Sequence, residues 1–323
     1  MWLRWIGGRF GGMEMILTIT MNPAIDKVYA IDDFQVNQVF RPKAMTATAG
    51  GKGLNVARVA RILGEAVMAT GFLGGSTGQF IHKQVEKMGV INRFIPIQGE
   101  TRICINIMDE KNTTSTEILE PGPVVSREEC NLFLEEYEKM LDSCDIVTAS
   151  GSLPKGVPAD FYNMLIEIAN TKGKKFILDT SGDYFKQGIQ AKPYMVKPNK
   201  EELENAVGSH FGTFHDYESV LMKLKEQGIQ LPVVTLGKDG CIAALEDGIY
   251  RFFAPSVKVL NTVGSGDSFV AGCAVSLCRG KESFEAIKMG MACGIANTQF
   301  FETGLVSIEL VAKFFNMIEI EKL

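Results

Sequence analysis

Glycines, a serine and an aspartate stand together in the segment NTVGSGDSFVAG, residues 261–272. An apolar helical sequence follows, so the N–H groups of Gly264, Ser265 and Gly266 would face an anion at the N-terminus of a helix. Asp267 can simply cap that helix. It can also be a general base, which takes a proton from an alcohol while the N–H groups stabilise a phosphoryl group in transfer. The second interpretation predicts phosphoryl transfer at this segment.

A second glycine-rich junction, AGGKGLNVARVARILG, covers residues 49–64. Its glycines, Gly51 among them, would let a ligand approach the backbone closely, and Lys52 adds a cation at the start of a predicted helix. Asn55, just inside that helix, can hydrogen-bond a polyol. The alternative is a tight turn with a solvated lysine. The cluster of glycines costs more conformational entropy than a turn alone requires, which favours a binding site.

Two polar residues fall in segments that read as strands. Asp26, in TMNPAIDKVYA, can accept hydrogen bonds from two sugar hydroxyls or form an Asx turn. Arg102, in GETRICINI, would present a planar guanidinium that suits a phosphate group, although a single arginine is more often a plain surface residue. Both residues are candidates for binding a phosphorylated sugar.

Asn199 and Glu202 lie three residues apart in VKPNKEELENAV, after a predicted strand. A helix would put them on one face, where their oxygens suit Mg²⁺, often through water. The same pair forms a capping box, and the two interpretations are compatible. Thr235 and Gly237 close another predicted strand, at the edge where doubly wound sheets bind ligands.

The elements that must position these residues alternate along the chain. Buried-strand patterns cover residues 15–21, 67–74, 145–150, 175–181, 194–199 and 231–237. Amphipathic patterns of helical period cover residues 54–64, 77–89, 127–143, 159–173 and 217–228. Many of these helical patterns end in glycine, as a left-handed C-terminal cap requires. The alternation predicts an α/β fold, with a doubly wound, mostly parallel sheet flanked by helices on both faces.

Two segments interrupt this alternation. Residues 27–48 and 100–122 alternate apolar and polar side chains between turns, which predicts antiparallel hairpins that together form a small β-lid. No linker or repeat divides the chain, so we expect one domain over residues 15–323. Residues 1–14 are basic with two tryptophans, lack the pattern of a signal peptide and are interpreted as an appended segment.

Composition limits the function. The chain has 323 residues, of which 46% are hydrophobic and 22% charged, as in a soluble globular protein. A net charge of −5 gives no basic stripe for nucleic acid or membrane, and no stretch reaches the roughly 18 apolar residues of a membrane span. Scattered cysteines without CxxC predict reduced thiols and a cytoplasmic location. A Walker A loop, the fingerprint GxGxxG and a zinc motif are all missing from the sequence.

Taken in order, GGKGLNV, GSLPKG, VKPNKEEL and NTVGSGDSFVAG resemble the motifs of the ribokinase-like, phosphofructokinase-B family of sugar kinases. The resemblance covers Met15 to the C-terminus and rests above all on the last motif, with NxxE upstream of it. It implies a ribokinase-like fold and an ATP-dependent kinase that uses ATP and Mg²⁺ and acts on a sugar phosphate.

The resemblance also implies a role for each candidate residue. Asp267 is the general base, and the anion hole is formed by Gly264, Ser265 and Gly266 with the amide of Asp267. The sugar hydroxyls are held by Asp26, Gly51 and Asn55. The phosphate already on the sugar is bound by Lys52 and Arg102. The ATP side is lined by Lys197, Thr235, Gly237 and Asn297, and Mg²⁺ is organised through water by Asn199 and Glu202.

The segments TMNPAID, TAGGKGLNVARV, ATGFLGG, GETRICINI and TEILEPGP resemble the branch of this family that acts on ketohexose phosphates. Its tagatose-6-phosphate kinases phosphorylate the C1 hydroxyl and its 1-phosphofructokinases the C6 hydroxyl, and both form a 1,6-bisphosphate. Many 1-phosphofructokinases carry a lysine where this chain has Ile107 and Met108, which favours tagatose 6-phosphate. Phe40–Arg41 stands where Asn-Arg is usual, which leaves 1-phosphofructokinase open as the alternative.

Two further expectations concern partners. A non-catalytic sugar-phosphate sensor is the competing class, but such a protein would be expected to lose the base or the anion hole, and both are present here. Exposed edges of the β-lid strands predict a homodimer formed through the lid.

Overall fold

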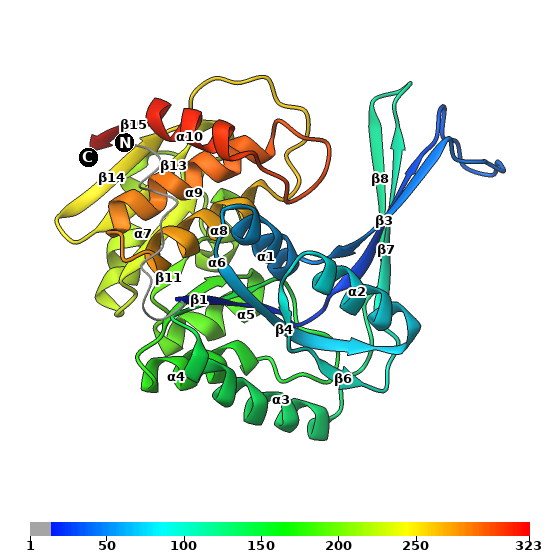
Figure 1. The fold of residues 1–323 in the computed structure, drawn as a ribbon. Helices are drawn as coiled ribbons and strands as arrows, with labels where there is room; N and C mark the ends of the chain where they lie inside the picture. Colours follow the sequence, from blue (N-terminus) through cyan, green and yellow to red (C-terminus); the bar gives the residue numbers. More distant parts are fainter. Residues whose placement is uncertain (1–13) are drawn as a thin grey trace.

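The computed structural model describes residues 14–323 as a three-layer α/β protein with an eleven-stranded sheet in the middle (Figure 1). The prediction of an appended segment at residues 1–14 concerns residues that lie, apart from Glu14, outside the described range. The strand order is β15-β14-β13-β12-β11-β10-β9-β1-β4-β5, with β6 paired to β4. The pairs from β12 to β5 are parallel, and β13, β14 and β15 extend one edge in antiparallel fashion.

The strands of the large sheet confirm the predicted buried-strand patterns. They are β1 (Met15–Thr20), β4 (Ala66–Gly74), β5 (Ile91–Asn92), β6 (Ile95–Ile97), β9 (Ile146–Ser150), β10 (Lys175–Asp179), β11 (Met195–Val196), β12 (Leu231–Thr235), β13 (Cys241–Leu245), β14 (Gly248–Phe253) and β15 (Glu319–Lys322). The strand predicted over residues 194–199 is shorter, because Pro198 has no N–H for the ladder and Asn199 already caps the next helix. The sequence patterns do not indicate β5, β6 or β13 to β15.

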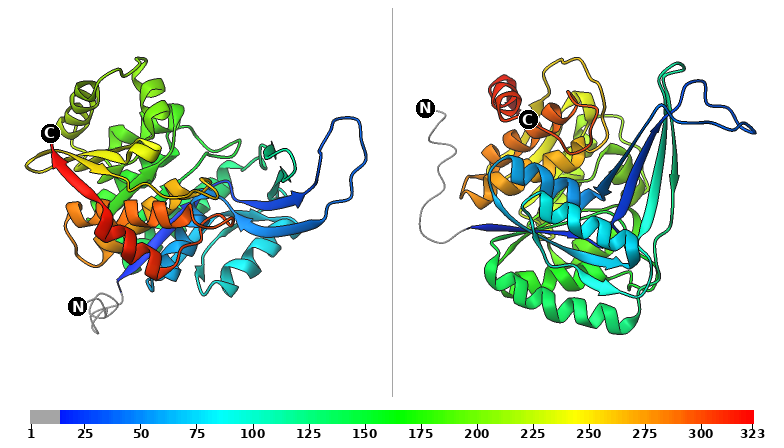
Figure 2. Two further views of the ribbon diagram at one scale, coloured as in Figure 1. Left: turned by 90° about the horizontal axis from the view of Figure 1, so that it is seen from above. Right: turned by 45° about the vertical axis from the view of Figure 1, so that its right-hand side comes forward.

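Helices cover both faces of this sheet, as predicted (Figure 2). They are α1 (Lys52–Ile62), α2 (Gly75–Lys87), α3 (Arg127–Met140), α4 (Phe161–Thr171), α5 (Gly182–Gly188), α6 (Lys200–Val207), α7 (Phe214–Glu226), α8 (Ser265–Cys278), α9 (Ser283–Asn297) and α10 (Ile308–Met317). One core cluster joins the sheet to α1, α2, α8, α9 and α10, and a second joins it to α3, α4 and α5. Helices α5, α9 and α10 are not among the predicted ones.

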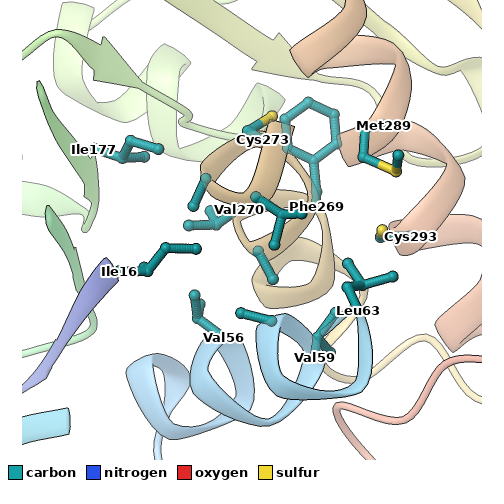
Figure 3. Packing of buried hydrophobic residues seen from close by; sticks show 14 of the residues in the cluster. Ile16, Val56, Val59, Leu63, Ile177, Phe269, Val270, Cys273, Met289 and Cys293 are labelled. Atoms are coloured by element: carbon teal, nitrogen blue, oxygen red, sulfur yellow. The ribbon is translucent and has the colours of Figure 1, made fainter. Parts of the chain in front are cut away.

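The core brings α1 and α8 together against the sheet. Neighbouring residues of β1 point into opposite clusters, because side chains alternate along a strand: Ile16 faces one side and Leu17 the other. In Figure 3, Ile16 lies near Val56 of α1 and Val270 of α8. These two helices begin at the two glycine-rich motifs, so their packing sets the motifs side by side.

A separate four-stranded sheet projects from the main body (Figures 1 and 2). Its order is β3-β2-β7-β8, formed by β2 (Ala24–Ala30), β3 (Ala44–Gly50), β7 (Arg102–Asp109) and β8 (Thr114–Leu119). Each hairpin is antiparallel as predicted, but β2 and β7 join the two hairpins as a parallel pair, with Asp26 opposite Cys104. The pairing is parallel because both strands run outward from the main body. We call this sheet the β-lid.

Three smaller expectations can be checked on the described residues. Gly64 and Gly173 follow α1 and α4 with φ of 97° and 66°, which confirms the predicted glycine caps. All seven cysteines are free and buried. Among the helices of residues 14–323, none combines the length and the hydropathy that a membrane crossing requires.

Candidate active site

The candidate residues converge at the carboxyl ends of the parallel strands. Asp179 ends β10, and its pairing with β9 sets it opposite Ser150. Lys197 directly follows β11, and Thr235 ends β12, where it forms a bridge with Asn199. This edge is where doubly wound sheets bind ligands. The neighbouring glycine-rich starts of α1 and α8 close the same side of the site.

Asp267 lies in the first turn of α8 with only 6% of its surface exposed. Its Oδ2 accepts a hydrogen bond of 2.8 Å from Asn55 Nδ2. Burial, and next the negative charge of Asp179, raise the pKa of Asp267 to about 6, while Asn55, Lys52 and Lys197 oppose that rise. A carboxylate of this pKa is ionised at neutral pH and can still take up a proton, as a general base must.

The N-terminus of α8 provides the anion-binding groups. Gly264 is the N-cap with φ of 77°, a left-handed conformation in which a Cβ would also collide with the Thr303 side chain. The N–H groups of Gly266 and Asp267, in the first turn, have no acceptor within the helix. Ser265 differs from the prediction, because its N–H and its hydroxyl both turn back to the carbonyl oxygen of Thr262, at 3.2 Å and 2.7 Å.

The start of α1 contributes a cation to the candidate site. Gly51 is the N-cap of α1, and Lys52 is its first residue. The carboxylate of Asp179, above all, raises the pKa of Lys52, with further contributions from Asp267 and Glu202. Lys52 therefore lies within electrostatic range of these three carboxylates.

Asp26 and Arg102 form a second group at the base of the β-lid. Burial raises the pKa of Asp26 to about 6, against the positive charges of Arg102 and Arg58. Arg102 donates from Nε and Nη2 to the Asn22 carbonyl oxygen at 3.2 and 2.9 Å, and from Nη1 to that of Glu120 at 2.9 Å. Since a guanidinium carries five N–H groups, about two stay available to a ligand.

Arg102 also lines a surface cavity of about 420 Å³. The other residues that line it are Gly99, Glu100, Glu120, Pro121, Gly122, Pro123 and Val124. Lys52 and Arg102, predicted to bind one phosphate together, thus have different charged neighbours: Lys52 those around Asp267, and Arg102 those around Asp26.

Asn199 and Glu202 form the predicted capping box at the start of α6. Asn199 Oδ1 accepts from the Glu202 N–H at 2.8 Å, and Glu202 Oε2 accepts from the Asn199 N–H at 2.9 Å. The second carboxylate oxygen of Glu202 is not used by the box. Gly237, with φ of 60°, is exposed just beyond Thr235.

Asn297, predicted to line the ATP side, supports the loop that precedes α8. It is fully buried at the end of α9, and its amide bonds only to protein groups. Nδ2 donates to the Val263 carbonyl oxygen at 2.9 Å, and Oδ1 accepts from the Gly304 N–H at 2.8 Å and from the Ser268 hydroxyl at 3.2 Å. Asn297 therefore holds the loop that leads into Gly264.

The sequence profile of the pfkB family of carbohydrate kinases matches residues 15–309. The chain belongs to this family. The predicted recognition is confirmed, and the protein is an ATP-dependent sugar kinase.

Solved structures of this family share the whole fold. A possible 1-phosphofructokinase from Thermotoga maritima is 31% identical with a TM-score of 0.88, over 96% of this chain and 100% of that one. A Staphylococcus aureus protein provisionally described as a phosphofructokinase is 32% identical with a TM-score of 0.83, over 96% of this chain and 99% of that one. Phosphofructokinase-2 of Escherichia coli, in a tetrameric inhibited form, is 26% identical with a TM-score of 0.88, over 94% and 99%.

The donor set of this family member fits a hydrated Mg²⁺ ion. The predicted donors are the oxygens of Asn199 and Glu202, and the capping box leaves one carboxylate oxygen of Glu202 unused. Within residues 14–323, no three His, Cys, Asp or Glu side chains form a cluster that could ligate an ion directly. Oxygen donors that stay apart suit Mg²⁺, because this ion keeps several of its waters when it binds to proteins.

Two residues of the kinase site are missing from the sequence-based set. Asp179 is buried and pairs with Lys197 at 3.1 Å, in an ion pair that both the Asp267 carboxylate and the Lys52 ammonium sense. Its only signal in the sequence is a carboxylate that follows a buried-strand pattern in KFILDTS. The second is Arg58, which NVARV shows merely as a polar position of a helix.

Proposed function

We propose that this kinase transfers the γ-phosphoryl group of ATP to a hydroxyl of a ketohexose monophosphate and forms the 1,6-bisphosphate. One observation carries the proposal: Asp267, whose pKa burial raises to about 6, stands in the same helical turn as unpaired N–H groups. The carboxylate can take the proton of the acceptor hydroxyl, and the N–H groups can bind the phosphoryl group that this hydroxyl attacks.

The residues act in sequence in this proposal. Asp26 and the free N–H of Asn55 orient the sugar hydroxyls, and Arg102 binds the phosphate already on the sugar. Asp267 accepts the proton of the attacking hydroxyl. The N–H groups of Gly266 and Asp267, with the ammonium of Lys52, stabilise the charge on the phosphoryl group, which is the main contribution that a kinase makes.

ATP lies beside Lys197, Thr235 and Gly237 in this proposal. Glu202 and Asn199 hold Mg²⁺ through water, and the ion, when bound, neutralises phosphate charge. The β-lid excludes water, which would otherwise compete as the acceptor.

We propose tagatose 6-phosphate as the preferred substrate, because Ile107 and Met108 on β7 offer no lysine to a phosphate at C1. Fructose 1-phosphate is the second candidate, favoured by the name of the Thermotoga maritima relative. The test compares kcat/KM for tagatose 6-phosphate, fructose 1-phosphate and fructose 6-phosphate, with the products assigned by ³¹P NMR. Preference for tagatose 6-phosphate supports the first assignment, preference for fructose 1-phosphate supports the second, and no transfer to any of the three sugars overturns the function.

We further propose that two chains associate through the β-lid. Met45, Ile118 and Leu119 of the β-lid expose 57%, 54% and 63% of their surface, and β8 lies at an open edge of the sheet. Light scattering of Ile118→Lys should show a monomer where the natural chain is a dimer. Leu132→Lys, an exposed position on α3, is the matched control and should not change the mass.

A further inference from the structure

Arg58 joins three segments of the chain behind the candidate base. It lies on α1, half-buried, one turn after Asn55. Its Nη1 donates to Asn55 Oδ1 at 2.9 Å and to the carbonyl oxygen of Thr303 at 3.1 Å. Its Nη2 donates to the carbonyl oxygen of Ala49, near the end of β3, at 2.7 Å. One guanidinium therefore ties the base of the β-lid and the loop after α9 to the helix that carries Asn55.

The chemistry of a guanidinium decides how the Asn55 amide is turned. A guanidinium has only donors, so the oxygen of the amide must face Arg58 and the NH₂ group must point away from it. That NH₂ group donates to Asp267 Oδ2 at 2.8 Å. A flipped amide would set NH₂ against the guanidinium and oxygen against the carboxylate, which replaces two hydrogen bonds by two repulsive contacts.

The backbone at Gly304 packs closely against Arg58 and Asn55. Gly304 has φ of 69°, and a Cβ there would lie 2.9 Å from Arg58 Nη1 and 3.2 Å from Asn55 Cβ. The Gly304 N–H donates to Asn297, which in turn holds the carbonyl oxygen of Val263. The network that orients Asn55 therefore continues to the residue before Gly264, so the base and the anion hole share one support.

We propose that Arg58 is a positioning residue for phosphoryl transfer: it fixes the Asn55 amide so that Nδ2 occupies one oxygen of Asp267 and leaves the other for the acceptor hydroxyl. The inference rests on the proposed role of Asp267 as the base. Arg58 contacts Asn55, Thr303 and Ala49, none of which belongs to the proposed Mg²⁺ site. We therefore expect loss of Arg58 to affect the base and not the binding of Mg²⁺.

Removal of Arg58 has an electrostatic consequence as well as a geometric one. The charged groups that act on Asp267 are Asp179, Lys52, Lys197 and Arg58. Loss of the guanidinium removes one cation and frees the amide that donates to the carboxylate. Both changes raise the pKa of Asp267, so the acidic limb of the pH–rate profile should move to higher pH.

The experiment compares Arg58→Met, Arg58→Lys and the control Arg61→Met, with kcat measured against pH. Arg61 lies one turn further along α1 and bonds to the carbonyl oxygen of Glu65, away from the site. We expect Arg58→Met to lose about 10²-fold in kcat and to shift the acidic limb upward, with little change of KM for ATP. Arg58→Lys keeps the charge but not the fork, so its acidic limb stays in place and only part of the rate returns. Arg61→Met should match the natural chain.

A natural kcat and an unshifted acidic limb in Arg58→Met would overturn the proposal. If Arg58→Met does not fold, the kcat of Arg58→Lys decides. A kcat equal to that of the natural chain counts against a role for the planar guanidinium and its fixed N–H donors. A double-mutant cycle of Arg58→Met and Asn55→Ala, measured by urea unfolding, gives the Arg58–Asn55 coupling energy without any turnover. Additive losses of unfolding free energy would overturn the proposal that Arg58 fixes the Asn55 amide. If the coupling is present while Asp267→Asn stays active, Arg58 does orient Asn55, but Asp267 is not the base.

Discussion

Asn55 and Asp267 are 212 positions apart in the chain, and their side chains meet at 2.8 Å between helices α1 and α8. The contact links the GGKG segment, which the proposed function gives to the sugar, to the GSGD segment, which it gives to the phosphoryl group. Because Asp267 is buried, this single donor bears directly on whether its carboxylate is ionised at neutral pH.

Asp267→Asn should abolish phosphoryl transfer and leave ATP binding nearly unchanged. Loss of a general base costs about 10²- to 10⁴-fold in kcat, and the anion hole does not depend on the carboxylate. Coupled-assay turnover and isothermal titration with ATP measure the two effects. Turnover at the natural rate would exclude Asp267 as the base.

The same variant should be more stable than the natural chain above neutral pH. Since the folded protein raises the pKa of Asp267 from 3.8 to about 6, the folded state binds its proton more tightly, and stability falls as pH rises through about 6. Asparagine removes this loss, which is worth up to about 3 kcal/mol. Urea unfolding at about pH 5 and pH 8 checks it, and a larger gain at the lower pH would contradict the sign.

The rate should rise with pH on the acidic side of neutrality. Asp267 must be ionised to accept the proton, so kcat should increase as pH passes about 6 and then level off. Saturating substrate is required, because a sugar phosphate has its own ionisation near pH 6. A kcat that is constant between about pH 5 and pH 8 would argue against a titrating base.

Arg102→Ala should raise KM for the sugar phosphate far more than KM for ATP. Its remaining N–H groups are the ones available to a phosphate, and charge-assisted hydrogen bonds of this kind contribute about 1.5 to 3 kcal/mol, or roughly 10- to 100-fold in KM. Arg127→Ala, at an exposed position at the start of α3, is the control. Equal effects on both substrates would mean that Arg102 does not contact the sugar's phosphate.

Glu202→Gln should raise the Mg²⁺ concentration that gives half-maximal activity. Glutamine still accepts the N–H of Asn199, so the capping box and α6 are kept while the charge is lost. Glu201→Gln, an exposed neighbour in the same helical turn, controls for net charge. Activity that persists in a chelator, or identical Mg²⁺ curves for both variants, would discard the proposed ion site.

Lys197→Met should destabilise the protein by about 3 to 5 kcal/mol, because it leaves the buried Asp179 carboxylate without its partner at 3.1 Å. Thermal or urea unfolding measures the loss. Lys139→Met, which breaks an exposed pair with Glu136, should cost less than about 1 kcal/mol. Similar losses for both variants would show that the buried ion pair contributes no more to stability than the exposed one.

Local signals account for what could be predicted. Each strand and helix pattern is contained within a few neighbouring residues, as in residues 15–21 and 54–64, and the Asn199–Glu202 box needs only one helical turn. The sequence patterns did not predict strands β13 to β15, which form the antiparallel edge of the large sheet. The parallel pairing of β2 with β7 was not predicted either, because the residues within each hairpin do not determine how the two hairpins pair with each other.

The sequence by itself determined the family and the α/β alternation, and it singled out Asp267 as the candidate base, because Asp267 and its glycines lie within one short motif. Only the tertiary structure decided which groups act on that base. Asp179, Lys197, Asn55 and Arg58 come from separate elements, and burial, charge and hydrogen bonding depend on distances in space that no spacing along the chain contains. The same holds for Asn297, which is fully buried and supports the loop before Gly264.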